Sequence, residues 1–272
     1  PEDIPNATSL NTAVMTGSRI LGPALAAVLV ATIGTGWCFV INGLTFGAII
    51  LSLIAIRPAE MYRMPRRARG GQPVREALRF LGSRRDMVVI HVVLVVVSTF
   101  AFNYTVSLPK LAEENWGGDA AFGWVLAVTS IGSLTGALLT ARLRRVSMSW
   151  FLVNVLVLGI AGVGLGWAPT IGLAFLWAIP LGIGGAGFIT AANALTQQES
   201  PSDMRSRLMA LQAVAFLGST PIGGPITGWV ADNVGAAWSL AYGAVIAIAS
   251  AFAAALYLAT RPDRVETAVA PS

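Results

Sequence analysis

The sequence predicts an all-α membrane protein, a polytopic bundle of transmembrane helices. Hydrophobic residues make up 55% of the 272 residues and charged residues only 11%, whereas a soluble domain has roughly 25% charged residues. The mean hydropathy is +0.71, and the apolar residues gather in long runs. A chain with so few charges cannot cover its surface in water, so we expect its solvent to be the lipid bilayer.

Eight apolar runs follow one another along the chain, and each is long enough to cross a bilayer, which takes about 20 residues in a helix. Because backbone groups in hydrocarbon must hydrogen-bond within their own segment, we expect each run to be a helix. The alternation typical of a membrane barrel is absent. The predicted helices are residues 10–31, 37–56, 87–108, 122–141, 150–167, 171–194, 208–231 and 237–260.

The arginines predict the orientation of these helices. The long loop between the second and third runs carries arginine at positions 57, 63, 66, 67, 69, 75, 79, 84 and 85. Loops 142–149 and 195–207 and the C-terminal tail are also basic, and such loops stay in the cytoplasm. We therefore expect a multi-pass protein of the cell (inner) membrane with both ends of this chain cytoplasmic. The rings expected near the outer interface are Trp37, Trp116, Trp124, Trp167 and Trp238.

Several classes of function are excluded by what the sequence holds. The single cysteine, Cys38, and the single histidine, His91, exclude an internal disulfide and Cys/His metal clusters. No paired carboxylates, Ser-His-Asp arrangement or phosphate loop is present, so neither an enzyme nor a cofactor is expected. The net charge of +5 comes from the basic loops, so nucleic acid is not an expected partner. Residues 182–187 match G-x-G-x-x-G, but inside an apolar run they predict close helix packing.

The long basic loop contains an amphipathic pattern at residues 73–83. Arg75 and Arg79 fall on one side of a helix there, and the apolar side contains Val74, Ala77, Leu78 and Leu81. This pattern predicts a short helix lying on the anionic inner leaflet. The alternative is a solvated linker.

The beginning and the end of the chain share one pattern at an offset of about 200 residues, too long for a solenoid repeat. The matching pairs are Pro1 and Pro201, Asp3 and Asp203, Gly17 and Gly218, Gly22-Pro23 and Gly224-Pro225, Gly34 and Gly235, Trp37 and Trp238, and Arg57-Pro58 and Arg261-Pro262. The first two helices therefore match the last two, so the period is six helices and a full pair of repeats has twelve. We expect the eight predicted helices to be helices five to twelve of the twelve. The four N-terminal helices of the same protein are then an expected partner of this chain.

This repeat predicts the organisation of the chain in four parts. Residues 1–58 form the last two helices of an N-terminal six-helix bundle, and residues 59–86 form a cytoplasmic inter-bundle loop. Residues 87–260 form a C-terminal six-helix bundle, and residues 261–272 form a cytoplasmic tail.

Two six-helix repeats joined by a long basic loop resemble the major facilitator superfamily. The stretch from Gly17 to Pro23, Gly-Ser-Arg-Ile-Leu-Gly-Pro, resembles the family's antiporter motif, with Ala26-Ala27 in place of a glycine pair. The stretch from Gly132 to Arg145 resembles the loop motif between the eighth and ninth helices, without its usual aspartate, and residues 201–207 resemble the loop before the eleventh helix. The opening Pro-Glu-Asp-Ile-Pro-Asn-Ala, an intramembrane arginine and Gly-Pro look closest to the drug and siderophore exporter branch, which includes enterobactin-exporter-like proteins.

The resemblance implies roles for two groups of residues. The residues that would let helices bend and pack at the interface between the bundles are Gly17, Gly22, Pro23, Gly224 and Pro225. The residues implied in a cytoplasmic gating loop are Gly132, Gly136, Arg142 and Arg145. The missing aspartate argues against a gating salt bridge in that loop.

Three polar positions are candidates for the substrate cavity or for coupling. Arg19 lies about ten residues into an apolar helix, where an arginine costs about 2.5–3.5 kcal/mol, so it must face a cavity, carbonyl groups or an acid. It is either a coupling or anion-attracting group or a structural arginine. Asn103 and Tyr104 form a polar end to the third run and either bind substrate or lie at the interface. His91 is either an interfacial residue or part of a proton relay.

The resemblance implies a transporter that exports a small amphipathic molecule, a drug or a siderophore, by alternating access with proton entry. The transported small molecule, protons and the lipid bilayer are then its partners. Two alternatives stay open at this point. One is uptake of a nutrient by a transporter of the same superfamily, and the other is a truncated membrane fragment without transport.

Overall fold

The computed structural model describes residues 29, 33, 36–56, 73–201 and 204–260. The chain divides into two units, residues 1–72 and residues 73–272. In the first unit, the helix Gly36–Ala55 coincides with the predicted run 37–56. The predicted run 10–31, which holds Gly17, Arg19, Gly22 and Pro23, lies outside the described residues.

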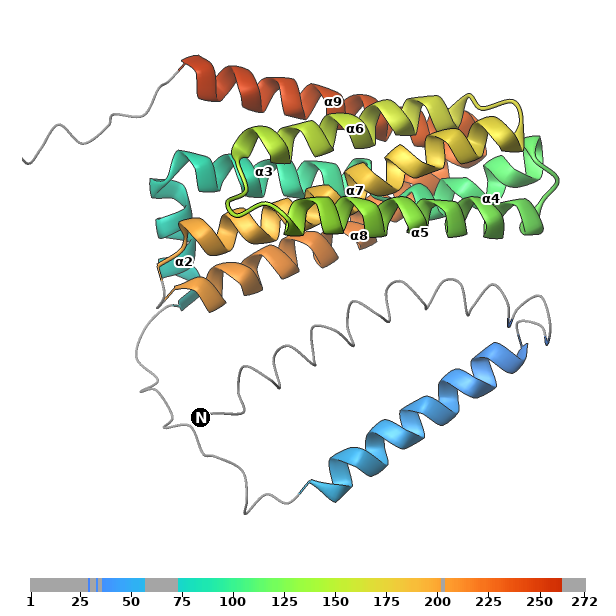
Figure 1. The fold of residues 1–272 in the computed structure, drawn as a ribbon, viewed down its shortest axis with the longest axis horizontal. Coiled ribbons are helices and arrows are strands. Elements are labelled where there is room, and N and C mark those ends of the chain that lie inside the picture. The colour runs from blue at the N-terminus through green and yellow to red at the C-terminus, as the bar shows by residue number, and fades with distance from the viewer. Residues whose placement is uncertain (1–28, 30–32, 34–35, 57–72, 202–203, 261–272) are drawn as a thin grey trace, which may run out of the picture. The chain divides into compact units, whose positions relative to one another are not determined.

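The second unit is all-α, as predicted, and no strand occurs among the residues that the structure describes. Its helices α3 to α9 run alongside one another, and α2 lies across one end of them (Figure 1). The helices are α2 (Pro73–Ser83), α3 (Arg85–Phe100), α4 (Tyr104–Asn115), α5 (Asp119–Ala141), α6 (Met148–Gly166), α7 (Ile171–Glu199), α8 (Arg205–Asn233) and α9 (Ala236–Thr260).

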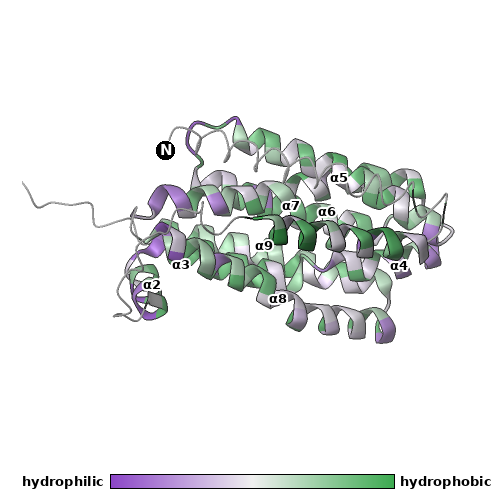
Figure 2. Cartoon of the chain, turned by 90° about the horizontal axis from the view of Figure 1, so that it is seen from below, coloured by the Kyte–Doolittle hydropathy of each residue, from purple (hydrophilic) through white to green (hydrophobic). Residues whose placement is uncertain are grey.

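Six helical segments of the described residues are long and apolar enough to cross a membrane. In the second unit, hydrophilic residues gather at the two ends of the helices, with hydrophobic residues between them (Figure 2). The candidate spans are Gly36–Ala55, Arg85–Asn115, Asp119–Ala141, Met148–Gly166, Ile171–Glu199 and Ala236–Thr260. The predicted run 208–231 does form helix α8, but α8 is not among the candidate spans. Its apolar character is diluted by glycine and proline and by polar residues such as Gln212 and Ser219.

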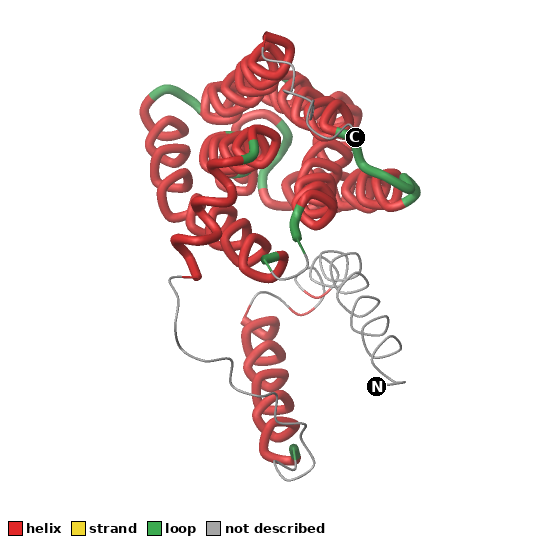
Figure 3. Tube along the Cα trace, turned by 90° about the vertical axis from the view of Figure 1, so that its left-hand side faces the viewer, coloured by secondary structure: helices red, strands yellow, loops and turns green. Residues whose placement is uncertain are grey.

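The two ends of the second unit differ in charge. We call the end at which α2 lies the α2 end, and the opposite end the far end (Figures 1 and 3). The α2 end holds the starts of α3, α6 and α8 and the ends of α5, α7 and α9. The loops predicted to be basic and cytoplasmic, after α5 and after α7, both lie there.

Close helix packing in this unit depends on small residues. A Cβ atom on Gly132 or Gly136 of α5 would overlap the carbonyl oxygen of Ile179 or Ile183 in α7, and one on Gly182 would overlap the carbonyl oxygen of Thr129. Gly184 and Gly187 likewise leave room for α6. Between lipid-exposed helices, such contacts provide the van der Waals energy that holds the helices together. The interpretation of residues 182–187 as a packing stretch is therefore confirmed.

Residues 73–83 form helix α2, so the alternative of a solvated linker is wrong for this stretch. Ala77 is buried, and Phe80 and Leu81 pack partly buried against the core. A Glu76 carboxylate oxygen accepts a hydrogen bond from Arg207 Nη1 at 2.6 Å. Part of the predicted apolar side therefore faces protein, against α3 and α8.

Three of the described tryptophans predicted near the outer interface, Trp124, Trp167 and Trp238, lie exposed at the far end. Trp167 and Trp238 contact each other edge to face, with ring centroids 5.3 Å apart. Trp116 lies at the same end but is buried, and its indole N–H donates to the carbonyl of Ala168 at 2.8 Å. Trp116 is therefore a packing residue that joins the end of α4 to the loop after α6, and not an exposed interfacial ring.

Candidate functional site

The predicted run 87–108 is one membrane span but two helices. Helix α3 ends at Phe100 and α4 begins at Tyr104. The amide of Phe102 bonds back to Val97 O, five residues earlier, which unwinds the last turn of α3. The Asn103 side chain then donates to Thr99 O at 2.6 Å, the carbonyl that a continuing helix would have paired with the Asn103 amide. Asparagine suits this place because its amide competes with helical backbone bonds.

Both polar residues predicted at this place, Asn103 and Tyr104, lie at the break between α3 and α4. Asn103 is buried and Tyr104 is half-buried. Phe102, between α3 and α4, contacts the Tyr104 ring and the Phe216 ring of α8 edge to face, with centroids 5.5 Å and 5.3 Å apart. The break therefore carries an aromatic cluster, which we call the hinge cluster: Phe102, Tyr104 and Phe216.

Helix α8 reaches the break through a glycine. A Cβ atom on Gly223 would overlap Thr99 O and lie against the Asn103 amide, whereas a Cβ on Gly224 would meet nothing within 4 Å. Pro221 and Pro225 lie on either side of this pair inside α8. Within the unit, the close packing is therefore made by Gly223, next to the predicted Gly224-Pro225 motif.

A second polar feature lies between α7 and α8. Gln212 Nε2 of α8 donates to Asn193 Oδ1 of α7 at 2.8 Å, a hydrogen bond between two helices. Gln212 is buried and its Oε1 atom has no partner among the described residues, while Asn193 is half-buried. Gln212 lies one turn before Phe216, so the amide pair and the hinge cluster adjoin along α8.

At the α2 end, one carboxylate joins three segments of the chain. Glu199, at the end of α7, lies 2.8 Å from the guanidinium of Arg84, between α2 and α3, and 3.7 Å from that of Arg145, in the loop after α5. The neighbouring Gln198, with its amide oriented to satisfy both groups, donates to Val146 O at 3.2 Å and accepts from Val146 N at 3.1 Å. The end of α7 therefore contacts the α5–α6 loop in two ways. Glu199 pairs with the side chain of Arg145, and Gln198 bonds to the backbone of Val146.

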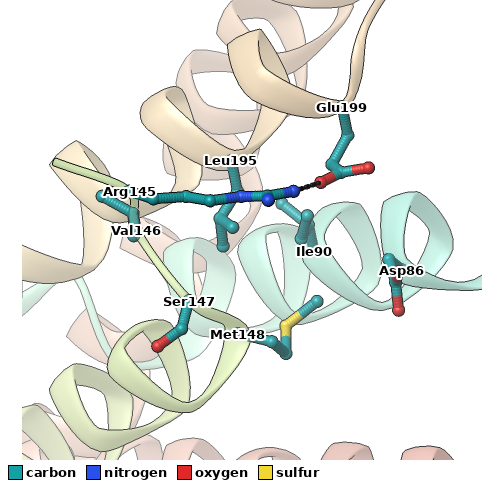
Figure 4. Close-up of a pocket in the computed structure, with 8 residues that line it drawn as sticks. All are labelled: Asp86, Ile90, Arg145, Val146, Ser147, Met148, Leu195 and Glu199. Carbon is teal, nitrogen blue, oxygen red and sulfur yellow. Dashed lines mark ion pairs between the residues drawn. The ribbon is translucent and has the colours of Figure 1, made fainter.

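Glu199, Arg145 and Val146 border a cavity of about 310 Å³ at the α2 end. In Figure 4 the Arg145 side chain reaches across toward Glu199, with the Leu195 and Ile90 side chains beside it. The cavity is lined by Asp86, Ile90, Arg145, Val146, Ser147, Met148, Leu195 and Glu199. We call the ion pairs of Glu199 with Arg84 and Arg145 the α2-end charge cluster.

The residues implied in the gating loop do not all lie in a loop. Gly132 and Gly136 are buried within α5, where they pack on α7, and Arg142 and Arg145 belong to the connection between α5 and α6. The missing aspartate of the motif argued against a salt bridge in this loop. Arg145 nevertheless has an acidic partner, Glu199, which comes from α7 and not from the motif itself.

His91 lies inside the bundle and not at an exposed interface. Its side chain is only 6% exposed. Nδ1 lies 2.8 Å from the carbonyl oxygen of Met87, so Nδ1 carries the proton in this bond. Nε2 has no hydrogen-bond partner in the described part of the chain.

Sequence reasoning missed Glu199, Gly223 and Phe216. Glu199 stood outside the predicted run 171–194, in a loop noted only for its arginines. One signal was available, because Glu199 is an acid among several arginines in the loops assigned to the same side. Gly223 and Phe216 had no signal, since only the approach of α3 to α8 gives them their contacts.

The second unit is thus a bundle of membrane-spanning helices with a broken helix and an interhelical charge cluster, the architecture of a polytopic membrane protein. The family profile of transmembrane secretion effectors, a major facilitator family, matches residues 1–271. The chain therefore belongs to this family.

Curated relatives agree with the family. The multidrug efflux pump Tap of Mycobacterium tuberculosis is 25% identical over 235 residues, covering 82% of this chain and 54% of Tap. The MFS-type transporter YfiS of Bacillus subtilis is 27% identical over 256 residues, 86% of this chain and 58% of YfiS. The chain thus spans about half the length of the curated relatives it matches.

A solved structure shows the same fold. The crystal structure of a bacterial homologue of the human lysosomal transporter Spinster, in an inward-facing and unoccupied conformation, has a TM-score of 0.59 to this chain. The two are 15% identical, and the match covers 95% of this chain and 70% of that one.

Proposed function

We propose that the full-length protein is an efflux transporter of the inner membrane, which exports a small amphipathic molecule, a drug or a siderophore, in exchange for protons. The observation that carries this proposal is the match to Tap, a multidrug efflux pump, along 82% of this chain. The matched region therefore includes most of the helices described above.

In the proposed cycle, residues 87–260 act as one of two bundles that rock against each other around a central site. The repeat in the sequence supports this, because residues 1–58 match residues 201–262 and so represent the end of the other bundle. The α2 end is proposed to face the cytoplasm, as are both ends of this chain.

The break between α3 and α4 supports a gating role for α4. The regular helical hydrogen bonds are interrupted at residues 101–103. Helix α4 can therefore tilt without bending the rest of the span. Asn103 and the hinge cluster lie at the pivot. In our proposal, the aromatic rings of the hinge cluster contact the apolar part of the substrate. The side-chain amides of Asn193 and Gln212 form hydrogen bonds with the polar part of the substrate.

The α2-end charge cluster is proposed to hold the cytoplasmic gate. Glu199 joins α7 to Arg145 and to the segment before α3, so a change in the spacing of α3 and α7 is transmitted to the α5–α6 loop. Arg19 is proposed to act in the first bundle as a coupling or anion-attracting group.

Accumulation of ethidium, a lipophilic cation, tests export. The full-length protein, expressed in a host that lacks its own efflux pumps, should lower cellular accumulation, and a protonophore should restore it. Unchanged accumulation of every lipophilic cation and siderophore tested would exclude export. A lowered accumulation that a protonophore does not affect would leave export standing and exclude proton coupling.

Arg19 is tested in the same assay. We expect Arg19→Ala to abolish transport while the protein still inserts into the membrane, because an intramembrane arginine that faces the transport path supplies a charge that alanine lacks. Membrane insertion is measured from the amount of protein in the membrane fraction. Transport at the level of the unmodified protein would show that Arg19 is structural.

A further inference from the structure

The position of α2 is restricted to the surface of the membrane. Only Arg84 separates α2 from α3, and α3 begins the candidate span Arg85–Asn115. At its other end, Glu76 is bonded to Arg207 in the first turn of α8 at 2.6 Å. A helix held at both places must lie at the level where α3 leaves the bilayer, and Figure 1 shows it across the end of the bundle.

The sides of α2 differ in what they meet. Ala77, Phe80 and Leu81 face the bundle. Val74 and Leu78, one helical turn apart, stay 63% and 50% exposed although they are apolar. Beside them on the helix, also one turn apart, are the exposed side chains of Arg75 and Arg79.

We propose that this outward side of α2, formed by Val74, Arg75, Leu78 and Arg79, binds anionic phospholipids of the bilayer. An apolar pair beside an arginine pair fits the boundary between acyl chains and headgroups. The apolar side chains enter the acyl boundary, and the arginine stems lie along it with their guanidinium groups among the phosphates. A guanidinium group matches a phosphate with two parallel hydrogen bonds, and a net negative headgroup adds attraction that a zwitterionic one lacks. This surface is independent of what the protein transports.

The experiment uses the full-length protein with Cys38→Ala and Leu78→Cys, labelled with an environment-sensitive fluorophore and placed in nanodiscs of phosphatidylcholine and phosphatidylglycerol. A spin-labelled form of one lipid or the other serves as the quencher. We expect phosphatidylglycerol to quench more strongly than phosphatidylcholine. Arg75→Gln with Arg79→Gln should lower this preference, on the order of fivefold for each arginine, from the attraction of arginine to an anionic surface.

A matched control is Arg142→Gln with Arg144→Gln, which removes two exposed arginines of the same end from the α5–α6 loop and should leave the preference at residue 78 unchanged. High salt should lower the preference in the protein that keeps its arginines, so the test does not depend on how the variants fold. Equal quenching by both lipids would overturn the proposal. Absence of quenching by either lipid would also overturn it, because protein would then cover this side of α2.

Discussion

At the scale of single residues, two glycines of α5 determine how closely α5 approaches α7. Gly132 and Gly136 lie one turn apart, and each leaves room only for a backbone carbonyl of α7. Thr129 and Thr140 continue the same buried stripe, and their hydroxyls donate to carbonyls of their own helix at 2.8 Å and 2.9 Å. The stripe therefore presents small, internally satisfied residues to α7, which is what helix association in lipid requires.

We expect Gly132→Ala and Gly136→Ala each to lower the stability of the protein. The added methyl group overlaps the α7 backbone, and overpacking of this kind costs about 1–3 kcal/mol. Gly123→Ala in the same helix is the matched control, because a Cβ there meets nothing within 4 Å. The control should be neutral or more stable by up to about 1 kcal/mol, the gain in helix propensity. Unfolding in mixed detergent micelles measures all three, and equal effects would contradict the assignment of the stripe.

At the scale of helices, hydropathy predicts where a helix crosses the membrane but not where it ends or breaks. The run 171–194 gave the apolar part of α7, but the helix continues through polar residues to Glu199, because helical hydrogen bonds do not need apolar side chains. The run 87–108 predicts one helix with a polar end, so the break at residues 101–103 was not predicted. It depends on a local bond of the Asn103 side chain to Thr99 O and on the packing of Gly223 of α8 against the same carbonyl, a contact between segments far apart in the sequence.

The same limit applies to the candidate site. Asn103 and Tyr104 were predicted because polar residues stand out at the end of an apolar run. The partner of Arg145 was not predicted, since neither hydropathy nor a local motif says which loop meets which helix end. Arg19 and the Gly22-Pro23 motif stay predictions, because they lie outside the described residues.

We expect Glu199→Gln to loosen the connection between α5 and α6. The change removes both ion pairs of the α2-end charge cluster and keeps the Gln198 bonds to Val146. Partly exposed ion pairs contribute about 0–1 kcal/mol, so hydrogen exchange in residues 142–147 should rise by no more than about fivefold. Arg144→Gln, an exposed arginine of the same loop, is the control and should leave the exchange unchanged. Unchanged exchange in Glu199→Gln would show that Glu199 does not hold the loop.

Lys110 connects α4 to the last turn of α8. Its Nζ donates to Ala231 O at 2.7 Å and to Asp232 Oδ1 at 2.9 Å. The Asp232 side chain is 75% exposed. The ion pair between Lys110 and Asp232 therefore contributes to stability as a surface ion pair does, by less than about 1 kcal/mol. The carbonyl of Ala231 is one of the orphan acceptors of a helix end, and a charged donor to such a group contributes about 1.5–3 kcal/mol.

We therefore expect Lys110→Met to destabilise the protein more than Asp232→Asn does. Methionine keeps the apolar part of the lysine side chain, so the difference reports the bond to Ala231 O. A double-mutant cycle in the micelle unfolding assay separates the two contributions. Equal losses in the two single variants would show that the ion pair, and not the carbonyl bond, holds α4 to α8.

At the scale of the whole molecule, the charges of the second unit are divided between its two ends. Every arginine that the structure describes lies at the α2 end, at positions 75, 79, 84, 85, 142, 144, 145, 205 and 207. The far end holds one basic residue of the described chain, Lys110, together with Glu113, Glu114, Asp119 and Asp232. The loops are short, and for short loops the bias of arginine and lysine sets the orientation in the membrane.

We expect single cysteines to report this orientation directly. Cys38→Ala removes the only native cysteine, after which Arg144→Cys marks the α2 end and Glu114→Cys marks the far end, both at exposed positions. A membrane-impermeant maleimide added to intact cells should label residue 114, and it should label residue 144 only after the membrane is permeabilised. Each variant is the control for the other, because they differ only in the end that carries the thiol. Labelling of residue 144 in intact cells would reverse the topology and, with it, place the α2-end charge cluster at the outer gate.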